Sequence, residues 1–452
     1  MAALLPWTKD GSDDASSPTG RFRLEAALGR DPVKDPHERP PHAHGPQVSD
    51  PGGDEPDVVI VGGGCIGLGT AWRAARAGLR VTLADPHPGA GASWAAAGML
   101  APVTEVHYGE EDLLRLNLTS AARYPSFVAE LEREAETTVG YRRCGTLFVA
   151  ADSGDRAVLE ELHQFQQSLG LEVHVLSGRE CRSLEPMLAP GIRGGILAPG
   201  DHQVDNRRLA PALLTAATRR GVAIRRTAVV EVVVTDGRAS GVRLEGGEVL
   251  DAGTVVLAAG CWSGSIPGPP TGALPALRPV KGQIVHLRGP AHPPFLSRNL
   301  RGVAQGSQVY LVPRQDGRVV LGATVEEKGY DTAITAEAVY TLLRDAHQLL
   351  PGVLELELAE THAGLRPASI DNAPLLGPSS LPGLVIATGH YRNGVLLTPV
   401  TADAMATYLA TGRLEEDVTP FSPARFGDPG SGRRLDGAAG RAGRIEGGEL
   451  VR

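Results

Sequence analysis

The segment 57–85 places the strongest constraint on how this chain can fold. It reads DVVIVGGGCIGLGTAWRAARAGLRVTLAD, and its residues 58–61 form a continuous β-branched run. Such a run is typical of a parallel strand that is buried on both faces. Gly62, Gly64 and Gly67 follow at G-x-G-x-x-G spacing, and small and apolar residues then recur at helical spacing. The segment therefore predicts a strand, a tight turn, a helix and a second strand.

Each glycine of this turn has a physical role in binding a dinucleotide. Gly62 permits the tight turn, Gly64 lets the backbone approach a pyrophosphate, and Gly67 lets the helix pack closely on the strand. The positive end of the helix dipole then faces the phosphates. Asp85 ends the second strand, where a carboxylate can accept hydrogen bonds from a ribose. The motif alone would be weak, but its flanking strands, helix and acid together predict a dinucleotide cofactor.

The segment after Asp85 favours FAD over NAD. It reads PHPGAGASWAAAGMLAP, a stretch of small residues that lets the backbone approach a large flat ligand. The string SWAAAGML resembles the corresponding segment of the FAD-dependent amine and D-amino-acid oxidases. The string GTVVLAAGCWSG at 253–264 resembles the strand and turn that close over the flavin in the same family.

Three later segments make the resemblance more specific. VYLVPRQDGRVVLGAT contains Tyr310 and predicts a β-hairpin, THAGLRPASIDNAPLLG contains Arg366, and GHYRNGVLLTP contains Arg392. Together with RPVKGQIVHL, these strings resemble the glycine oxidases of thiamine biosynthesis, within the FAD-dependent D-amino-acid oxidase family. The resemblance extends over about 57–426.

The alternation of strand-like and helical patterns predicts an α/β fold, and the resemblance implies two domains. A Rossmann-like FAD-binding domain, similar to that of glutathione reductase, would comprise 56–140, 196–275 and 358–426. An α+β substrate-binding domain with a mainly antiparallel sheet would comprise 141–195 and 276–357. The segments 1–55 and 427–452 are rich in Pro, Gly and polar residues. We expect them to be a disordered arm and a disordered tail.

The resemblance also implies where a substrate binds. Residues matching Arg366 and Tyr310 hold the substrate carboxylate, and the residue matching Arg392 lies in the same site. A buried guanidinium needs an anionic partner and can bind a carboxylate with two parallel hydrogen bonds. We expect a helix to begin near 393–394 and to point at the flavin. Taken singly, Arg366 could be a salt-bridged loop residue, Tyr310 a packed residue, and Arg392 the partner of an internal carboxylate.

The expected FAD contacts come from the glycine turn, the end of the second strand, the small-residue segment and three later positions in the chain. They are Gly62, Gly64, Cys65, Ile66, Gly67, Asp85, Pro86, Ala92, Ser93, Ala97, Gly98, Met99, Val229, Gly260, His390, Tyr391, Asn393, Gly394, Val395 and Leu396. No cysteine follows Cys261, so we expect FAD to be bound noncovalently. No metal site is expected.

The implied reaction is oxidation of glycine, with sarcosine and small D-amino acids as further candidates. Hydride would pass from Cα to flavin N5, and hydrolysis of the imino acid would give glyoxylate and ammonia. Oxygen would be reduced to hydrogen peroxide. No catalytic acid or base is assigned, because hydride transfer from a neutral amine needs none. The glycine imine would supply the thiazole of thiamine. Gln308 stands where some family members have a histidine, which affects the expected rim of the pocket.

Other functions stay open at this stage. They are a D-amino-acid or sarcosine oxidase or dehydrogenase, a flavin module that modifies tRNA, and a nonenzymatic FAD-binding protein. The net charge of −8 argues against nucleic acid as a partner. No apolar run is long enough to predict a membrane span, and four scattered cysteines favour a reducing cytoplasm. The resemblance suggests a homo-oligomer, a homotetramer in particular.

Overall fold

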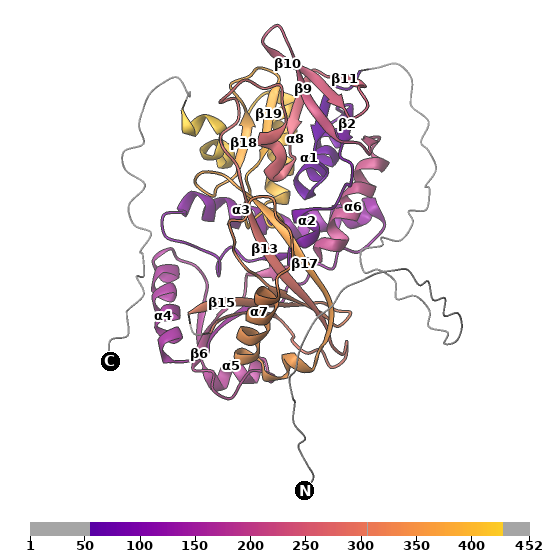
Figure 1. The fold of residues 1–452 in the computed structure, drawn as a ribbon. Helices are drawn as coiled ribbons and strands as arrows, with labels where there is room; N and C mark the ends of the chain where they lie inside the picture. Colours follow the sequence, from indigo (N-terminus) through magenta and orange to yellow (C-terminus); the bar gives the residue numbers. More distant parts are fainter. Residues whose placement is uncertain (1–54, 305, 428–452) are drawn as a thin grey trace, which may run out of the picture. The chain divides into compact units, whose positions relative to one another are not determined.

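The computed structural model describes residues 55–304 and 306–427, which are built around two large β-sheets (Figure 1). The expected arm, apart from its last residue, and the expected tail after Gly427 lie outside these described residues. The α/β fold class predicted from the sequence is confirmed, because one large sheet is mostly parallel and the other mostly antiparallel.

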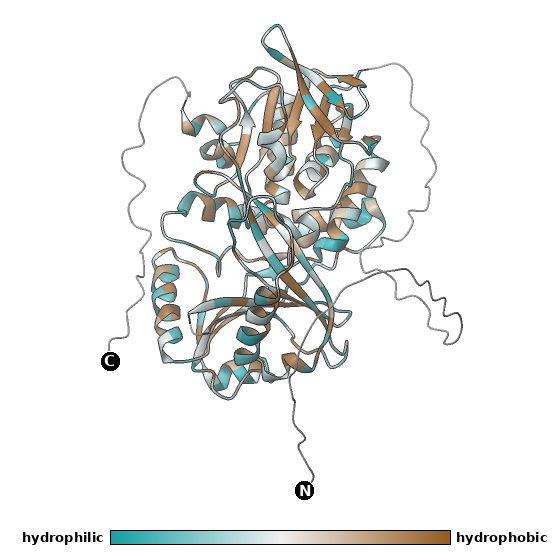
Figure 2. Ribbon diagram, viewed as in Figure 1, coloured by the Kyte–Doolittle hydropathy of each residue, from teal (hydrophilic) through white to brown (hydrophobic). Residues whose placement is uncertain are grey.

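The first large sheet contains the predicted strand–turn–helix unit. β1, β2, β8, β12 and β19 run parallel to one another, and β18 adds an antiparallel edge. The strand order is β18-β19-β12-β1-β2-β8. The strands span Val58–Val61 (β1), Val81–Ala84 (β2), Ala223–Arg225 (β8), Thr254–Leu257 (β12), Leu375–Pro378 (β18) and Leu384–Thr388 (β19). Most of this sheet is hydrophobic (Figure 2), as expected for strands covered on both faces.

Helices cover one face of this sheet. Small residues let α1 approach its neighbours closely, since a Cβ on Gly69 would lie 3.2 Å from the Cβ of Ala402. Trp72 is buried edge-on against Phe127, with ring centroids 5.3 Å apart. The helices are α1 (Cys65–Arg76), α3 (Glu111–Ala135), α6 (Asn206–Arg219) and α8 (Thr398–Thr411).

A small antiparallel sheet packs on the other face of the first sheet. It contains β9 (Val229–Thr235), β10 (Arg238–Leu244) and β11 (Val249–Asp251), and it shares a buried hydrophobic cluster with β1 and β12. The 3-10 helix η1 (Gly260–Ser265) follows β12 directly.

The second large sheet has eight strands in the order β17-β13-β16-β15-β14-β4-β6-β5. Neighbouring strands are antiparallel except β14 and β4, which are parallel. The strands span Thr146–Ala150 (β4), His174–Ser177 (β5), Gly194–Ala198 (β6), Arg278–Arg288 (β13), Asn299–Ala304 (β14), Ser307–Pro313 (β15), Arg318–Gly322 (β16) and Glu357–Ala368 (β17). The hairpin expected around Tyr310 is therefore present as β15–β16.

The second sheet has helices on both sides. On one face, α7 (Ala336–Leu349), α5 (Gly178–Leu184) and η2 (Pro351–Glu355) contribute to a large buried cluster. On the other face, α4 (Ser153–Ser168) packs on Phe148 and Ile196. The chain passes between the sheets through α2 (Ala92–Ala95), β3 (Met99–Leu100) and β7 (His202–Gln203), and η3 (Glu416–Phe421) and η4 (Pro423–Phe426) complete the described chain.

Two of the expected domain boundaries do not agree with the observed strands. The expected break at 195/196 falls inside β6, and the expected break at 357/358 assigns β17 to the FAD-binding domain. β17 instead pairs with β13 from Arg278↔Ala368 to Arg288↔Glu357, so it belongs to the second sheet. The helix expected near 393–394 also begins later: turns occupy 394–397, and α8 starts at Thr398.

Candidate active site

The turn between β1 and α1 has the geometry of a dinucleotide cradle. Gly62 has φ +108°, and a Cβ there would collide with the backbone of Ala258. A Cβ on Gly67 would overlap the carbonyl oxygen of Gly62, so helix and strand are in backbone contact. Only glycine fits both positions. A Cβ on Gly64 would lie 3.1 Å from the Ser93 hydroxyl, in the space where the pyrophosphate is expected to approach the backbone.

Asp85 lies beside this turn. Its Oδ2 accepts a 2.7 Å hydrogen bond from the Gly63 amide, and its Oδ1 accepts one of 2.7 Å from the His87 amide. Each carboxylate oxygen has a further lone pair that a ribose hydroxyl could use. The carboxylate is thus fixed in the place where the nucleotide-binding prediction requires an acceptor.

Ser93 connects the small-residue segment to α1. Its hydroxyl accepts a 2.9 Å hydrogen bond from the amide of Cys65, the first residue of α1. The side-chain amide of Asn206 donates to the carbonyl oxygens of Ser93 and Trp94, at 2.8 and 2.9 Å. These bonds position α2 at the phosphate end of the cradle.

A buried arginine holds the next part of the same segment. Arg314 is 5% exposed, and its Nη2 donates to the carbonyl oxygen of Ala97 at 2.7 Å. Its Nη1 donates to Gln203 Oε1 at 2.7 Å and to the carbonyl oxygen of Val204 at 3.1 Å. Burial lowers the pKa of Arg314 to about 10, which still leaves it charged at neutral pH. Arg314 therefore ties the second sheet to the expected flavin-binding backbone at Ala97 and Gly98.

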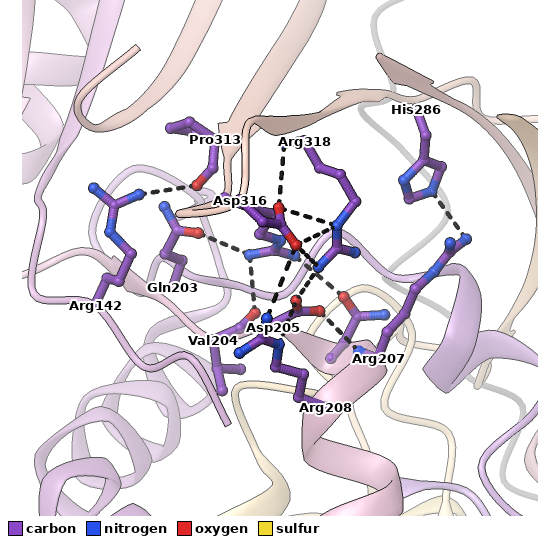
Figure 3. A network of polar contacts seen from close by, with 12 residues as sticks. Arg142, Gln203, Val204, Asp205, Arg207, Arg208, His286, Pro313, Asp316 and Arg318 are labelled. Atoms are coloured by element: carbon purple, nitrogen blue, oxygen red, sulfur yellow. Dashed lines mark hydrogen bonds and ion pairs between the residues drawn. The ribbon is translucent and has the colours of Figure 1, made fainter. Parts of the chain in front are cut away.

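Figure 3 shows the wider network to which these contacts belong. In it, Arg318 forms a 2.6 Å ion pair with Asp205, and Arg142 donates to the carbonyl oxygen of Pro313 at 3.0 Å. Arg207 lies 3.1 Å from His286 on β13. The network thus joins α6 and the β7 region to the second sheet by several charged contacts.

The other expected FAD contacts fall along the same path. Cys65 and Ile66 begin α1, Pro86 follows β2, Ala92 begins α2, and Met99 begins β3. Val229 begins β9, and Gly260 begins η1 with φ +59° and open space where a Cβ would stand. The residues present fit an extended dinucleotide such as FAD, since glycine turns, a fixed acceptor and open backbone occur in one continuous region.

Arg366 lies flat over the strand beside its own. A Cβ on Gly282 would collide with its guanidinium, and its Nη1 donates to the carbonyl oxygens of Lys281 and Thr324, both at 3.2 Å. Among the described residues, no carboxylate lies within ion-pairing distance of Arg366. It is therefore a half-buried cation whose described partners are all neutral carbonyl groups.

Tyr310 lies on the same face of the sheet. Its hydroxyl lies over Gly322, which pairs with both Tyr310 and Ile284. Burial raises the pKa of Tyr310 to about 12, and the positive charge of Arg366 acts in the opposite direction. The hydroxyl thus stays protonated at neutral pH and can donate a hydrogen bond. The structure brings Tyr310 and Arg366 together, as expected.

Arg392 is connected to this face of the sheet through Glu105 and Arg301, and it has internal partners. Its Nη2 forms a 2.8 Å ion pair with Glu110 and donates to the carbonyl oxygen of Glu105 at 3.3 Å. The preceding residue, Tyr391, has φ +48° and donates to the carbonyl oxygen of Pro367 at 2.8 Å. The structure therefore shows Arg392 as the partner of an internal carboxylate, which was one of the alternatives left open by the sequence. Its contact with a substrate stays a prediction.

The segment after Tyr391 is fixed from behind by α3. The hydroxyl of Tyr124 donates to the carbonyl oxygen of Val395 at 2.7 Å, and that of Ser120 donates to Leu396 at 2.6 Å. His390 is 2% exposed, and its Nε2 lies 3.0 Å from the Thr401 hydroxyl. Burial lowers the pKa of His390 to about 3, so its imidazole is neutral. Asn393 and Gly394 lie in the segment of turns that links His390 to α8.

Four polar residues of this region were not foreseen from the sequence. They are Glu105, Glu110, Asn206 and Arg314, and none lies in a motif with a fixed spacing. Arg314 stands in the string VPRQDG, where the turn signal of Gln-Asp-Gly was the dominant feature. Lys281, one residue before Gly282, is 1% exposed and lies 2.9 Å from Asp331. It faces the side of the sheet opposite to Arg366, since it pairs with Leu365.

Two kinds of feature are absent from the residues that the structure describes. Across 55–304 and 306–427, no three His, Cys, Asp or Glu side chains are grouped as metal ligands would be. In the same residues, no helix has the length and hydrophobicity needed to cross a membrane.

The chain is similar in sequence to several known proteins. A bifunctional ThiO/ThiG protein of Synechocystis sp. is 36% identical over 377 residues, which cover 82% of this chain and 54% of that protein. The chain thus spans about half the length of such bifunctional relatives. A glycine oxidase of Geobacillus kaustophilus is 32% identical over 372 residues, covering 82% of this chain and 97% of the relative.

Solved structures agree with these sequence matches. The crystal structure of the Geobacillus kaustophilus glycine oxidase superposes with a TM-score of 0.74 at 33% identity, covering 82% of this chain and 98% of that one. The sequence profile of the family described as FAD dependent oxidoreductase matches residues 57–408. These matches confirm the resemblance inferred from the motifs. The chain belongs to the DAO family of FAD-dependent oxidoreductases.

Proposed function

We propose that this chain oxidises a small amino acid with bound FAD, and that glycine is its preferred substrate. The observation that carries the proposal is Arg366: no carboxylate among the described residues pairs with it, and it lies beside the protonated hydroxyl of Tyr310. A buried cation without an internal counter-ion favours an anionic ligand. The carboxylate of an amino acid supplies one.

The residues of the chain would bind and orient the substrate. Arg366 would hold the carboxylate through its guanidinium, and Tyr310 would donate a hydrogen bond to it. When bound, FAD supplies the acceptor for the Cα hydride, and the chain's contribution is orientation and electrostatics. Neutral His390, buried against Thr401, would exclude water at the side of α8 without gaining or losing a proton. The reaction would convert glycine, oxygen and water into glyoxylate, ammonia and hydrogen peroxide.

The glycine oxidase and ThiO/ThiG relatives support glycine as the substrate and a role in supplying the thiazole of thiamine. Small size of the substrate also agrees with Arg301, Glu105 and Gln308, which crowd the rim next to Tyr310. We further propose a noncovalently bound FAD, a cytoplasmic location and a homotetramer. The remaining FAD contacts proposed above, including Val229 and Gly260, belong to the same hypothesis.

A second candidate is a related amine substrate, such as sarcosine or a small D-amino acid. The hydrogen cyanide synthase subunit HcnC of Pseudomonas aeruginosa is 31% identical over 406 residues, so a relative with a different name is about as similar as the glycine oxidases. Gln308 stands where some family members have a histidine, which changes the expected rim of the pocket.

Anaerobic mixing tests the proposal directly. The purified holoenzyme is mixed separately with glycine, sarcosine, D-alanine and D-proline, and the loss of flavin absorbance is followed. We expect glycine to bleach the flavin fastest, and we expect peroxide when air is readmitted. Faster bleaching by the bulkier D-amino acids would move the assignment to a D-amino-acid oxidase. No bleaching by any of the four would contradict the proposed function.

A further inference from the structure

Four charged side chains form a chain of ionic contacts at the rim of the candidate substrate site. The rim cluster consists of Arg301, Arg392, Glu105 and Glu110. Glu105 pairs with Arg301 through Oε1 and lies 4.0 Å from the Nε of Arg392 through Oε2. Glu110 pairs with Arg392 at 2.8 Å. Glu105 is therefore the carboxylate that touches both arginines.

The rim cluster belongs to the same surface as the proposed carboxylate site. Arg301 on β14 is directly opposite Tyr310 on β15, so both side chains lie on one face of the sheet. Arg301 also donates to Gln308 Oε1 at 3.4 Å. The charges of Glu105 and Arg301 both influence the pKa of Tyr310, in opposite directions. A substrate held by Tyr310 would therefore have this cluster as its neighbour.

The charges of this region balance in a specific way. The two arginines of the rim cluster are offset by its two glutamates, which leaves the cluster neutral. Arg366 then adds one positive charge without a carboxylate partner among the residues that the structure describes. A site with one uncompensated cation matches a substrate with one carboxylate. A second carboxylate beside the rim cluster would be repelled by Glu105 and Glu110, which offsets its attraction to the two arginines.

Glu105 is also held firmly in place. The loop before it is fixed by Asp201, which accepts hydrogen bonds from the amides of Val103 and Thr104 at 3.0 and 2.9 Å. Gln166 donates to the carbonyl oxygen of Val103 at 3.0 Å. The Glu105 side chain is 16% exposed. These bonds fix the backbone just before Glu105, so its carboxylate starts from a defined position beside the arginines.

We propose that Glu105 determines the charge of the substrate that the site accepts. By pairing with Arg301 and lying 4.0 Å from Arg392, it keeps the rim cluster neutral, which favours amines with one carboxylate over amines with two. This inference rests on the proposed function, because it concerns the same site. It assigns Glu105 a role in specificity that acts through the two arginines.

The test compares two N-substituted glycines that differ in charge. Sarcosine carries an N-methyl group, and iminodiacetate carries an N-carboxymethyl group. The ratio of kcat/KM for iminodiacetate to that for sarcosine is measured in the wild-type holoenzyme and in Glu105→Gln, which keeps the side-chain shape. We expect the ratio to rise about tenfold or more, because the substitution removes one negative charge and leaves the rim cluster with one net positive charge for a second carboxylate. The exposed control Glu160→Gln should leave it unchanged.

A second variant protects the test against a folding defect. Glu110→Gln frees Arg392 alone and should raise the same ratio by a smaller factor than Glu105→Gln. If Glu105→Gln does not bind FAD, the Glu110→Gln ratio decides. A ratio equal to that of the wild type in the variant that binds FAD would overturn the inference. Failure of the wild type to be reduced by glycine or sarcosine would instead contradict the proposed function, so the two failures are distinguishable.

Discussion

At the scale of single residues, Arg366 is the side chain on which the proposed activity depends most. Replacing it with Met removes the cation while keeping an apolar stem of similar length. Loss of one member of a charge pair is expected to remove on the order of 2–5 kcal/mol of transition-state binding, so kcat/KM for glycine should fall by roughly 30-fold to several thousand-fold. Arg366→Lys should fall between wild type and Arg366→Met, because it keeps the charge without the planar fork.

Steady-state peroxide formation measures this loss, and Arg288→Met is a suitable control. Arg288 is exposed at the far end of β13, on the strand that also carries Gly282 under the Arg366 guanidinium. Equal activity of Arg366→Met and Arg288→Met would contradict the assignment of Arg366 to the substrate.

Tyr310 gives a prediction that separates binding from stability. Its hydroxyl has no protein hydrogen-bond partner within the described ranges, so Tyr310→Phe should change the free energy of unfolding by less than about 0.5 kcal/mol. The substrate would lose one hydrogen bond to its charged carboxylate, which is worth roughly 1.5–3 kcal/mol. We expect KM for glycine to rise at least about tenfold. Urea unfolding and initial-rate kinetics on the same preparation check both statements, and a stability loss without a KM change would contradict them.

The sequence supported some of these residues better than others. Arg366 and Tyr310 stand in strings that resemble those of the glycine oxidases, so the resemblance could place them in one site. The partners of Arg392 could not be predicted, because Glu105 and Glu110 are separated from it by 287 and 282 positions. Ion pairs over such distances depend on the fold, and no local pattern encodes them.

At the scale of elements, the β1–turn–α1 unit has the least tolerance for change. Gly67→Ala would place a Cβ on the carbonyl oxygen of Gly62, so α1 would have to shift away from β1. We expect the purified variant to lose most of its bound FAD, which the ratio of absorbance at 450 nm to that at 280 nm measures. Gly191→Ala is the matched control, because nothing lies within 4 Å of its Cβ position. Full FAD content in Gly67→Ala would contradict the role of this turn.

Local patterns predicted element types more reliably than element membership. The strand β1 and the hairpin β15–β16 follow from β-branched runs and a Gln-Asp-Gly turn, both of which are short-range signals. β17 was assigned to the wrong domain, because its pairing partner β13 lies about 80 residues earlier in the chain. The start of α8 was placed too early, since the Asn-Gly signal marks a turn that precedes Thr398.

At the scale of the whole described chain, Arg314 joins the second large sheet to the segment that is expected to bind the flavin. Arg314→Met would leave the carbonyl oxygens of Ala97 and Val204 without their donor, at about 1–3 kcal/mol for each buried group. We expect a lower thermal midpoint and a weaker affinity for FAD. Fluorescence-detected melting and FAD titration of the apoprotein measure the two effects. The exposed Arg156→Met should show neither, and an FAD affinity equal to wild type in Arg314→Met would contradict the proposed link.

Acid sensitivity of the whole fold follows from His390. The pKa of this imidazole is about 3 in the folded protein because it is buried, and about 6.5 when the chain is unfolded. Between these values the unfolded state binds more protons, so stability is full above pH 6.5 and falls as the pH decreases toward 3. The loss approaches 1.4 kcal/mol per pH unit, and it amounts to about 2 kcal/mol from pH 7.5 to pH 5. Because the Thr401 hydroxyl can either donate to or accept from Nε2, burial of the ring is what disfavours its protonated form.

His390→Gln removes this titration while keeping a polar partner for the Thr401 hydroxyl. Urea unfolding of the holoenzyme with saturating FAD, at pH 7.5 and at pH 5, gives the change in unfolding free energy for each protein. We expect the variant to be less stable than wild type at pH 7.5, yet to lose about 2 kcal/mol less on acidification. His174→Gln, on the exposed strand β5, should lose as much as the wild type. The same acid loss in His390→Gln and wild type would mean that other groups, His286 first among them, set the acid limit of this fold, since burial lowers the pKa of His286 to about 4.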